Sequence, residues 1–187
     1  MFMARDKKLT SYCIAIIILS GLLVRFILFY GTPVKLHSDS INPYLKLATD
    51  YYREGVFISP LITPGYPLFI NLCFKMFGLD NYNSIVLIQM LLGLMSSVAV
   101  FIISYKLMQS QYVSFFCAML YNFNIQIISF ENTVLSESLA ILVFLILVYF
   151  LIKDNAMPFV LFALSILLVL IRPGFIYFLF LIPFLIF

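Results

Sequence analysis

Charged residues are scarce in this 187-residue sequence. Asp, Glu, Lys and Arg together make up 10% of it, and hydrophobic residues make up 64%. A soluble domain contains about 25% charged residues and is about half apolar. With a mean hydropathy of +1.13, this chain cannot have water as its main solvent. The scarcity of charge therefore excludes an ordinary soluble domain and predicts an integral membrane protein.

Residues typical of metal and disulfide sites are also few. Histidine occurs once, at His37, and no CxxC or HExxH spacing is present. The three cysteines, Cys13, Cys73 and Cys117, lie in apolar segments, where free cysteine behaves as a small buried hydrophobic residue. These features argue against a histidine-based zinc site and a disulfide framework. The net charge of +3 is small and scattered, whereas nucleic-acid binding needs a clustered basic face, so no nucleic-acid partner is expected.

Apolar stretches occupy most of the chain, and a helix needs roughly 20 apolar residues to cross the hydrocarbon core. The stretches are 12–30, 84–105, 112–130, 134–152, 157–171 and 174–187. Arg172-Pro173-Gly174 separates the last two, and the sequence leaves open a tight hairpin or one broken span there. We predict an all-α, polytopic helical bundle of about five to six spans, forming one transmembrane domain over residues 1–187. The first span is 12–30, an outer loop is 31–83, and the remaining spans lie in 84–187.

The basic residues give the expected orientation. Arg5, Lys7 and Lys8 precede the first apolar stretch, which is long enough to span and is followed by no small-x-small cleavage site. We therefore interpret it as an uncleaved first span. Short later loops make neighbouring helices antiparallel, so Lys106 and Lys153 fall on the side of the N-terminus. The positive-inside rule then predicts a multi-pass protein with a cytoplasmic N-terminus, in the cell membrane if the source is bacterial.

The loop over 31–83 contains signals for two short helices. Asn42-Pro43 is typical of a helix start, and Gly55 is typical of a helix end. Aromatic and apolar residues between these signals recur on one helical face, opposite charged residues. A second short helix is predicted over 68–77, followed by Gly78. We predict that the loop carries amphipathic interfacial helices on the extracytoplasmic side.

Ionisable residues near the spans are functional candidates, since a charge at the bilayer centre costs about 2.5–3.5 kcal/mol. Arg25, in the first span, either snorkels to the headgroups or meets an anionic group such as a lipid phosphate. Asp39 is either a solvated turn residue or a carboxylate held at the membrane face. Glu137 is flanked by two serines, so we take Glu137 as the acid of a site and Glu131 as a solvated acid.

Other polar residues have plainer expected roles. Arg172 falls on the outer side, where an arginine commonly anchors a helix at the interface. Polar uncharged side chains inside the spans are expected to form interhelical hydrogen bonds. They are Gln89, Asn122, Asn124 and Gln126.

The order of several short motifs resembles one protein family. An arginine near the outer end of the first span is followed by Asp39-x-x-x-x-Tyr44, Ala48, Gly55, Pro64-Gly65-Tyr66-Pro67-Leu68-Phe69, Gln89, Leu135-Ser136-Glu137 and Ile171-Arg172-Pro173. Together these motifs resemble the N-terminal half of the GT-C membrane glycosyltransferases. The most similar branch holds the protein O-mannosyltransferases and the lipid A aminoarabinose transferase.

The resemblance implies inverting transfer of a sugar from a polyprenyl-phosphate-linked donor to an acceptor hydroxyl on the extracytoplasmic face. Asp39 matches the catalytic acid of the first outer loop, and Glu137 matches a second acid. Arg25 and Arg172 match basic positions facing the donor phosphate, and Tyr44 is expected to bind substrate with them. A carboxylate could accept the hydroxyl proton, while arginine stabilises the leaving phosphate. The two carboxylates could instead hold a divalent metal.

The length of this sequence, compared with that of the family, leaves an alternative function open. Members of the family are several hundred residues long, whereas this sequence stops within an apolar run, at Leu185-Ile186-Phe187, so we expect a chain truncated at its C-terminus. The alternative is a non-catalytic membrane half-fold that binds lipid phosphate or a partner membrane protein. Membrane lipids are partners under either hypothesis, and the sequence identifies neither the sugar nor the acceptor. Under the first hypothesis, Asp39→Asn abolishes transfer without affecting folding.

Overall fold

The computed structural model describes residues 2–36, 40–57, 59, 62–153 and 157–179. Within these ranges the regular structure is helical, and the one β-type contact is an isolated bridge between Lys35 and Thr133. The helices are α1 (Phe2–Gly31), η1 (Ser40–Leu45), α2 (Lys46–Glu54), α3 (Gly65–Phe77), α4 (Tyr82–Met108), α5 (Gln111–Asn122), α6 (Ile125–Glu131), α7 (Glu137–Leu151), α8 (Pro158–Ile171) and η2 (Pro173–Phe175). The predicted all-α architecture is confirmed.

Among the described residues, two helices are long and apolar enough to cross a membrane, namely α1 over Lys8–Gly31 and α4 over its full length. Helices α5 and α6 form a third span if they are counted together across a bend of 54°. Helices α7 and α8 have 15 and 14 residues. At 1.5 Å per residue they are about 21–22 Å long, which is shorter than the roughly 30 Å hydrocarbon core. In the described ranges there are thus two to three candidate spans, and the predicted five to six are not confirmed.

The bend after α5 divides a stretch that the sequence predicts as one continuous helix. Asn124 has an extended backbone, and its side chain accepts hydrogen bonds from the N–H groups of Gln126 and Ile127. It therefore caps the start of α6. The predicted interhelical role is wrong for Asn124, because its side-chain oxygen is used within its own chain segment.

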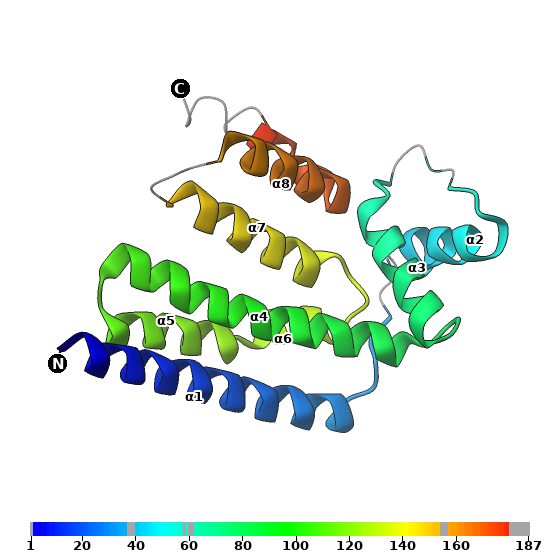
Figure 1. Ribbon diagram of the computed structural model, residues 1–187. Helices are drawn as coiled ribbons and strands as arrows, with labels where there is room; N and C mark the ends of the chain where they lie inside the picture. Colours follow the sequence, from blue (N-terminus) through cyan, green and yellow to red (C-terminus); the bar gives the residue numbers. More distant parts are fainter. Residues whose placement is uncertain (1, 37–39, 58, 60–61, 154–156, 180–187) are drawn as a thin grey trace.

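Helix α4 is the central element of the bundle. It packs against α1, α5 and α6 on one side and against α7 on the other, and α8 packs on the outside of α7 (Figure 1). The faces that α4 buries include small residues, Gly93, Ser96 and Ser97, which allow neighbouring helices to approach closely. Helices α2 and α3 pack together at one end of the bundle, beside the start of α4 (Figure 1).

The loop helices partly follow the predicted pattern. Helix α2 ends at Gly55, which adopts φ 70° and donates its N–H to Tyr51, so the predicted stop is confirmed. Leu45 and Ala48 are buried, while Lys46 is exposed, as the amphipathic pattern requires. Helical structure begins earlier than predicted in both cases, at the π-helical segment η1 before α2 and at Gly65 in α3. The placement of these helices on a membrane surface stays a prediction.

After α8 the chain reverses direction. Phe175, the last residue of the 3₁₀ turn η2, packs against the cluster that contains Leu168 and Ile171, near the end of α8. Three residues later, Phe178 packs against the cluster that contains Leu161, near the start of α8. The described part of this segment therefore runs back along α8, which favours the hairpin over the broken span.

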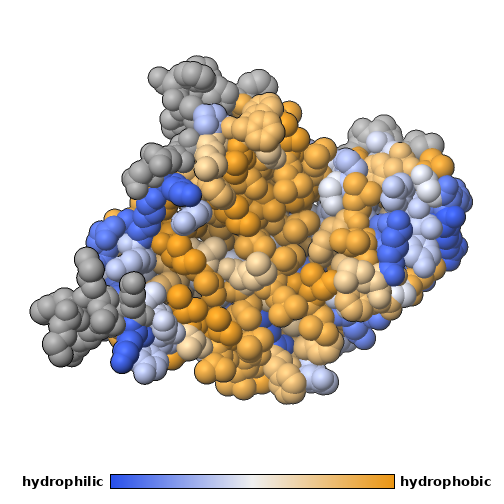
Figure 2. Space-filling view, in the orientation of Figure 1, coloured by the Kyte–Doolittle hydropathy of each residue, from blue (hydrophilic) through white to orange (hydrophobic). Residues whose placement is uncertain are grey.

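The surface of the bundle is largely apolar. Figure 2 shows hydrophobic surface over the middle of the bundle, with hydrophilic surface at the end formed by α2 and α3 and at the opposite end. On α1, Leu19, Leu23 and Phe26 are each more than 60% exposed. A continuous apolar surface of this kind is unfavourable in water and matches the hydrocarbon interior of a bilayer. The surface is therefore consistent with the predicted membrane location.

Candidate functional site

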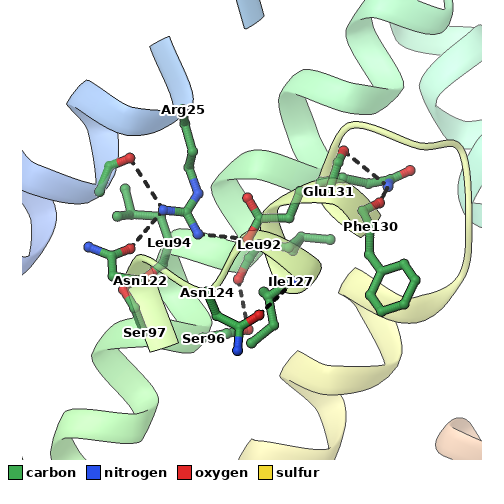
Figure 3. A network of polar contacts seen from close by, with 12 residues as sticks. Arg25, Leu92, Leu94, Ser96, Ser97, Asn122, Asn124, Ile127, Phe130 and Glu131 are labelled. Carbon is green, nitrogen blue, oxygen red and sulfur yellow. Dashed lines mark hydrogen bonds and ion pairs between the residues drawn. The ribbon is translucent and has the colours of Figure 1, made fainter. Parts of the chain in front are cut away.

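Arg25 and Glu131 form a buried ion pair between α1 and the end of α6. Arg25 Nη2 lies 2.7 Å from Glu131 Oε1, and the two side chains are 4% and 1% exposed. Arg25 Nη1 donates to Asn122 Oδ1 at 2.7 Å and to the carbonyl of Gly21 at 3.2 Å (Figure 3). Because the two charges compensate each other, the arginine can remain inside the bundle without reaching water or headgroups.

Two predictions are corrected by this pair. Glu131 is buried, so the prediction of a solvated acid is wrong. Arg25 does not snorkel, and its anionic partner is a carboxylate of the same chain. The bend before α6 directs Glu131 towards α4, where the absence of a side chain at Gly93 leaves room for the carboxylate. A contact between Arg25 and a donor phosphate stays a prediction.

Asn122 extends the buried network to α1. Its Nδ2 donates to the carbonyl of Ile17 at 2.9 Å, while its Oδ1 accepts from Arg25. A Cβ at Gly21 would lie 2.6 Å from Asn122 Oδ1, so glycine is needed for this close approach. The predicted interhelical hydrogen bonds of Asn122 are confirmed. The network holds α1, α5 and α6 together and leaves little of its polar surface exposed.

Gln89, on α4, links α3 to the chain that follows α6 through a second set of buried hydrogen bonds. Its Nε2 donates to the Thr133 carbonyl at 2.8 Å, and its Oε1 accepts from the Tyr66 hydroxyl at 2.8 Å. The predicted interhelical role of Gln89 is therefore confirmed. Burial raises the pKa of the Tyr66 phenol well above its usual value, and the negative charge of Glu137 raises it further. Tyr66 consequently stays protonated and acts as the donor to Gln89.

A second ion pair, between Glu137 and Arg172, opens to the surface. Arg172 Nη1 lies 2.6 Å from Glu137 Oε1, and the side chains are 45% and 19% exposed, respectively. Glu137 is the first residue of α7, where the positive end of the helix dipole favours a carboxylate. Its second oxygen, Oε2, is buried and has no hydrogen-bond partner among the described residues. This oxygen is therefore a buried acceptor that no described group satisfies.

Helix α3 brings aromatic residues to the same region. A Cβ at Gly65 would lie 2.5 Å from the Leu170 carbonyl, so the start of α3 touches the end of α8 just before Arg172. The Tyr44 ring meets the Tyr66 ring edge-to-face, with centroids 5.2 Å apart. We refer to Tyr44, Tyr66, Glu137 and Arg172 as the outer cluster.

No family model, curated protein or solved structure matches the chain in comparisons with known proteins. Membership in the glycosyltransferase family is therefore a proposal that rests on motif order in the sequence. Among the predicted site residues, Glu137 and Arg172 contact each other. The ring of Tyr44 packs against the ring of Tyr66. Arg25 belongs to the separate buried ion pair with Glu131. Asp39 lies outside the described residues.

Tyr66 is the residue that the predicted site omitted. Tyr66 lies in the Pro64–Phe69 motif, which is one of the motifs that resemble the family. The sequence could not show that its phenol is buried against Gln89, because that contact depends on tertiary structure. Within the described ranges, no three His, Cys, Asp or Glu side chains cluster as a metal site. The predicted carboxylate pair for a divalent metal includes Asp39, so it falls outside these ranges.

Proposed function

We propose that the chain binds a polyprenyl-phosphate-linked sugar donor at the outer cluster and transfers the sugar to an acceptor hydroxyl on the extracytoplasmic face. The observation that carries the proposal is the Glu137–Arg172 pair. It places a carboxylate oxygen without a partner beside a guanidinium that is 45% exposed. The Arg25–Glu131 pair is enclosed and offers no comparable access. A lipid-linked donor also fits a protein whose remaining surface is apolar.

Arg172 has the chemistry to hold the donor phosphate. A guanidinium has five N–H donors in a planar fork, and the contact with Glu137 uses one of its terminal nitrogens. The remaining donors can bind two phosphate oxygens at once. Arg172 would then stabilise the negative charge that grows on the phosphate as the bond to the sugar breaks.

Glu137 has the chemistry of a general base. In a single inverting displacement, the acceptor oxygen attacks the anomeric carbon, its proton moves to a carboxylate, and the lipid phosphate leaves with the bonding electrons. Glu137 Oε2 is the proposed proton acceptor, since Oε1 is bound to Arg172. Asp39 is proposed as the partner acid. Tyr44, which is half-buried, would contact the sugar. Tyr66 is fully buried and would support the Tyr44 ring from behind.

Binding and turnover test the proposal separately. The full chain is purified into phospholipid nanodiscs and given polyprenyl phosphate, neutral polyprenol, or a panel of polyprenyl-phosphate hexoses. We expect Arg172→Gln to weaken polyprenyl phosphate binding by roughly 10–100-fold, the usual worth of charged hydrogen bonds. Binding of polyprenol should not change. Lys46→Gln is the matched control, because Lys46 is an exposed cation on α2.

Turnover is followed as release of polyprenyl phosphate from the hexose donors, with water, sugars and hydroxyl-bearing peptides offered as acceptors. We expect Glu137→Gln to bind donor normally and to lose at least about 100-fold in rate, the usual contribution of a general base. An unchanged rate in Glu137→Gln would remove Glu137 from the mechanism. Tight binding by the wild-type chain without turnover of any donor would support the alternative, a non-catalytic lipid-phosphate-binding half-fold.

A further inference from the structure

A groove of about 440 Å³ runs between α1 and α6, on the opposite side of α4 from α7 and α8. One stripe of its lining comes from α1 and the chain after it, at Val24, Ile27, Leu28, Thr32 and Lys35. The other comes from α6 and the residues flanking it, at Phe123, Ile125, Ile128, Ser129 and Asn132. Both stripes begin with apolar residues and end with polar ones. The groove therefore has an apolar trough and a polar mouth.

Backbone contacts fix the position of the polar mouth. The N–H of Lys35 donates to the carbonyl of Asn132 at 3.1 Å, and the N–H of Val134 donates to the carbonyl of Lys35 at 3.3 Å. These bonds form the parallel bridge that joins the end of α1 to the end of α6. The mouth consequently lies at the ends of both helices, where a span would meet the headgroup layer.

Asn132 has a buried oxygen that lacks a partner. Its side chain is 4% exposed on a residue basis, and Nδ2 donates to Thr32 Oγ1 at 2.8 Å and to the Pro33 carbonyl at 3.3 Å. The Pro33 carbonyl can only accept, and the Thr32 hydroxyl donates its proton to Leu28. The amide nitrogen must therefore face these groups. Oδ1 is left as a buried acceptor without a donor among the described residues.

The charge at the mouth is positive. Lys35 is exposed, and none of the described residues that line the groove is acidic. Glu131, the residue before Asn132, is enclosed and paired with Arg25 on the α4 side. The mouth thus carries one cation above a hydrocarbon-lined trough, and Asn132, whose Oδ1 is buried, lies in its wall.

We propose that this groove binds one anionic phospholipid whose headgroup carries a hydroxyl. The phosphate would lie at Lys35, the headgroup hydroxyl would donate to Asn132 Oδ1, and one acyl chain would occupy the trough between Ile27 and Ile128. A cation next to apolar surface is the usual form of lipid-headgroup recognition by membrane proteins. The groove is lined by α1 and α6, not by residues of the outer cluster, so the proposal does not rest on the proposed sugar transfer.

Native mass spectrometry of the full chain tests the proposal. The protein is released from nanodiscs containing equal amounts of phosphatidylglycerol and phosphatidylcholine with identical acyl chains, and the lipids that remain bound are counted. We expect a single phosphatidylglycerol to be retained. Lys35→Gln should lower the preference for phosphatidylglycerol about fivefold, the usual effect of one lysine at an anionic surface. Lys46→Gln, the matched exposed cation, should leave the preference unchanged.

Two further comparisons test the hydroxyl and the trough. Phosphatidylmethanol has the charge of phosphatidylglycerol but no headgroup hydroxyl, and we expect it to be retained less. Ile27→Trp should fill the trough and reduce retention of every lipid, whereas Leu23→Trp should not. Both positions lie on α1 and are 59% and 61% exposed, so neither substitution disturbs the core.

Three results would contradict the proposal. Equal preferences in Lys35→Gln and Lys46→Gln would remove the headgroup site. Equal retention in Ile27→Trp and Leu23→Trp would remove the acyl chain from the groove. Release of the protein as a dimer that Ile27→Trp dissociates would assign the groove to a second copy of the chain instead.

Discussion

Gly93 on α4 lies directly against the carboxylate of Glu131, and no side chain could be accommodated between them. A Cβ at position 93 would overlap Oε1 and Cδ of Glu131. Gly21 on α1 has the same relationship to Asn122, whose Oδ1 would lie 2.6 Å from an added Cβ. Two glycines on neighbouring helices therefore define the space in which the Arg25–Glu131 pair is enclosed.

Replacing Gly93 by alanine is expected to separate the ion pair. The added methyl would displace the Glu131 carboxylate and leave Arg25 without its compensating charge, at a cost of about 3 kcal/mol. The measurement is the free energy of unfolding in mixed micelles with increasing SDS. Gly31→Ala is the control, because nothing lies within 4 Å of an added Cβ there. Equal unfolding midpoints for the two variants would contradict the prediction.

Removing one member of the ion pair should cost more than removing both. Glu131→Leu leaves a buried guanidinium uncompensated, and we expect a loss of about 3–5 kcal/mol in unfolding free energy. The double variant Arg25→Met, Glu131→Leu removes both charges and keeps the volume, so it should be more stable than Glu131→Leu. A double-mutant cycle measures this coupling. If the loss of unfolding free energy in the double variant equals the sum of the losses in the two single variants, the two charges do not interact.

Local features of the sequence were sufficient for much of the helical framework. Apolar length predicted α1 and α4, and single glycines predicted the ends of α2 and α3 at Gly55 and Gly78. The polar side chains of Gln89 and Asn122 were correctly assigned to interhelical bonds. Each of these predictions depends on a single residue or on the composition of one stretch as long as a helix.

The site depends on contacts between residues that are far apart in the sequence. The prediction that Glu131 is solvated used only the two serines that flank Glu137 in the sequence. The Asn124 cap bends the chain, and Gly93, far away in the sequence, leaves the space for the carboxylate. Likewise, the pairing of Glu137 with Arg172 requires α8 to return antiparallel to α7. The sequence could name both residues but could not show that they meet.

Tyr66→Phe should destabilise the fold through Gln89. Phenylalanine fills the same space but cannot donate, so Gln89 Oε1 becomes a buried acceptor without its hydrogen bond. The expected loss is about 1–3 kcal/mol in unfolding free energy. Tyr52→Phe, at a position that is 39% exposed, is the control. If thermal unfolding of Tyr66→Phe matches that of the control, the buried hydrogen bond contributes nothing to stability.

Gly65→Ala should detach the start of α3 from the end of α8. The new methyl would lie 2.5 Å from the Leu170 carbonyl, and backbone cannot yield as a flexible side chain can. We expect faster amide hydrogen exchange in α3 and weaker binding of polyprenyl phosphate, because Tyr66 would move away from Glu137 and Arg172. Gly174→Ala has open space around the added Cβ and serves as the control. Unchanged exchange in α3 would show that this contact does not position the outer cluster.

The predicted orientation can be tested by cysteine labelling. In a chain with Cys13, Cys73 and Cys117 replaced by serine, a single cysteine is placed either at Gly55, after α2, or at Ser110, between α4 and α5. The long helix α4 separates these positions, so we expect them to react with a membrane-impermeant maleimide from opposite sides of the membrane. The positive-inside rule places Ser110 on the cytoplasmic side with the N-terminus. Labelling of both positions in intact cells would show that α4 does not span, and labelling of Ser110 alone would reverse the orientation.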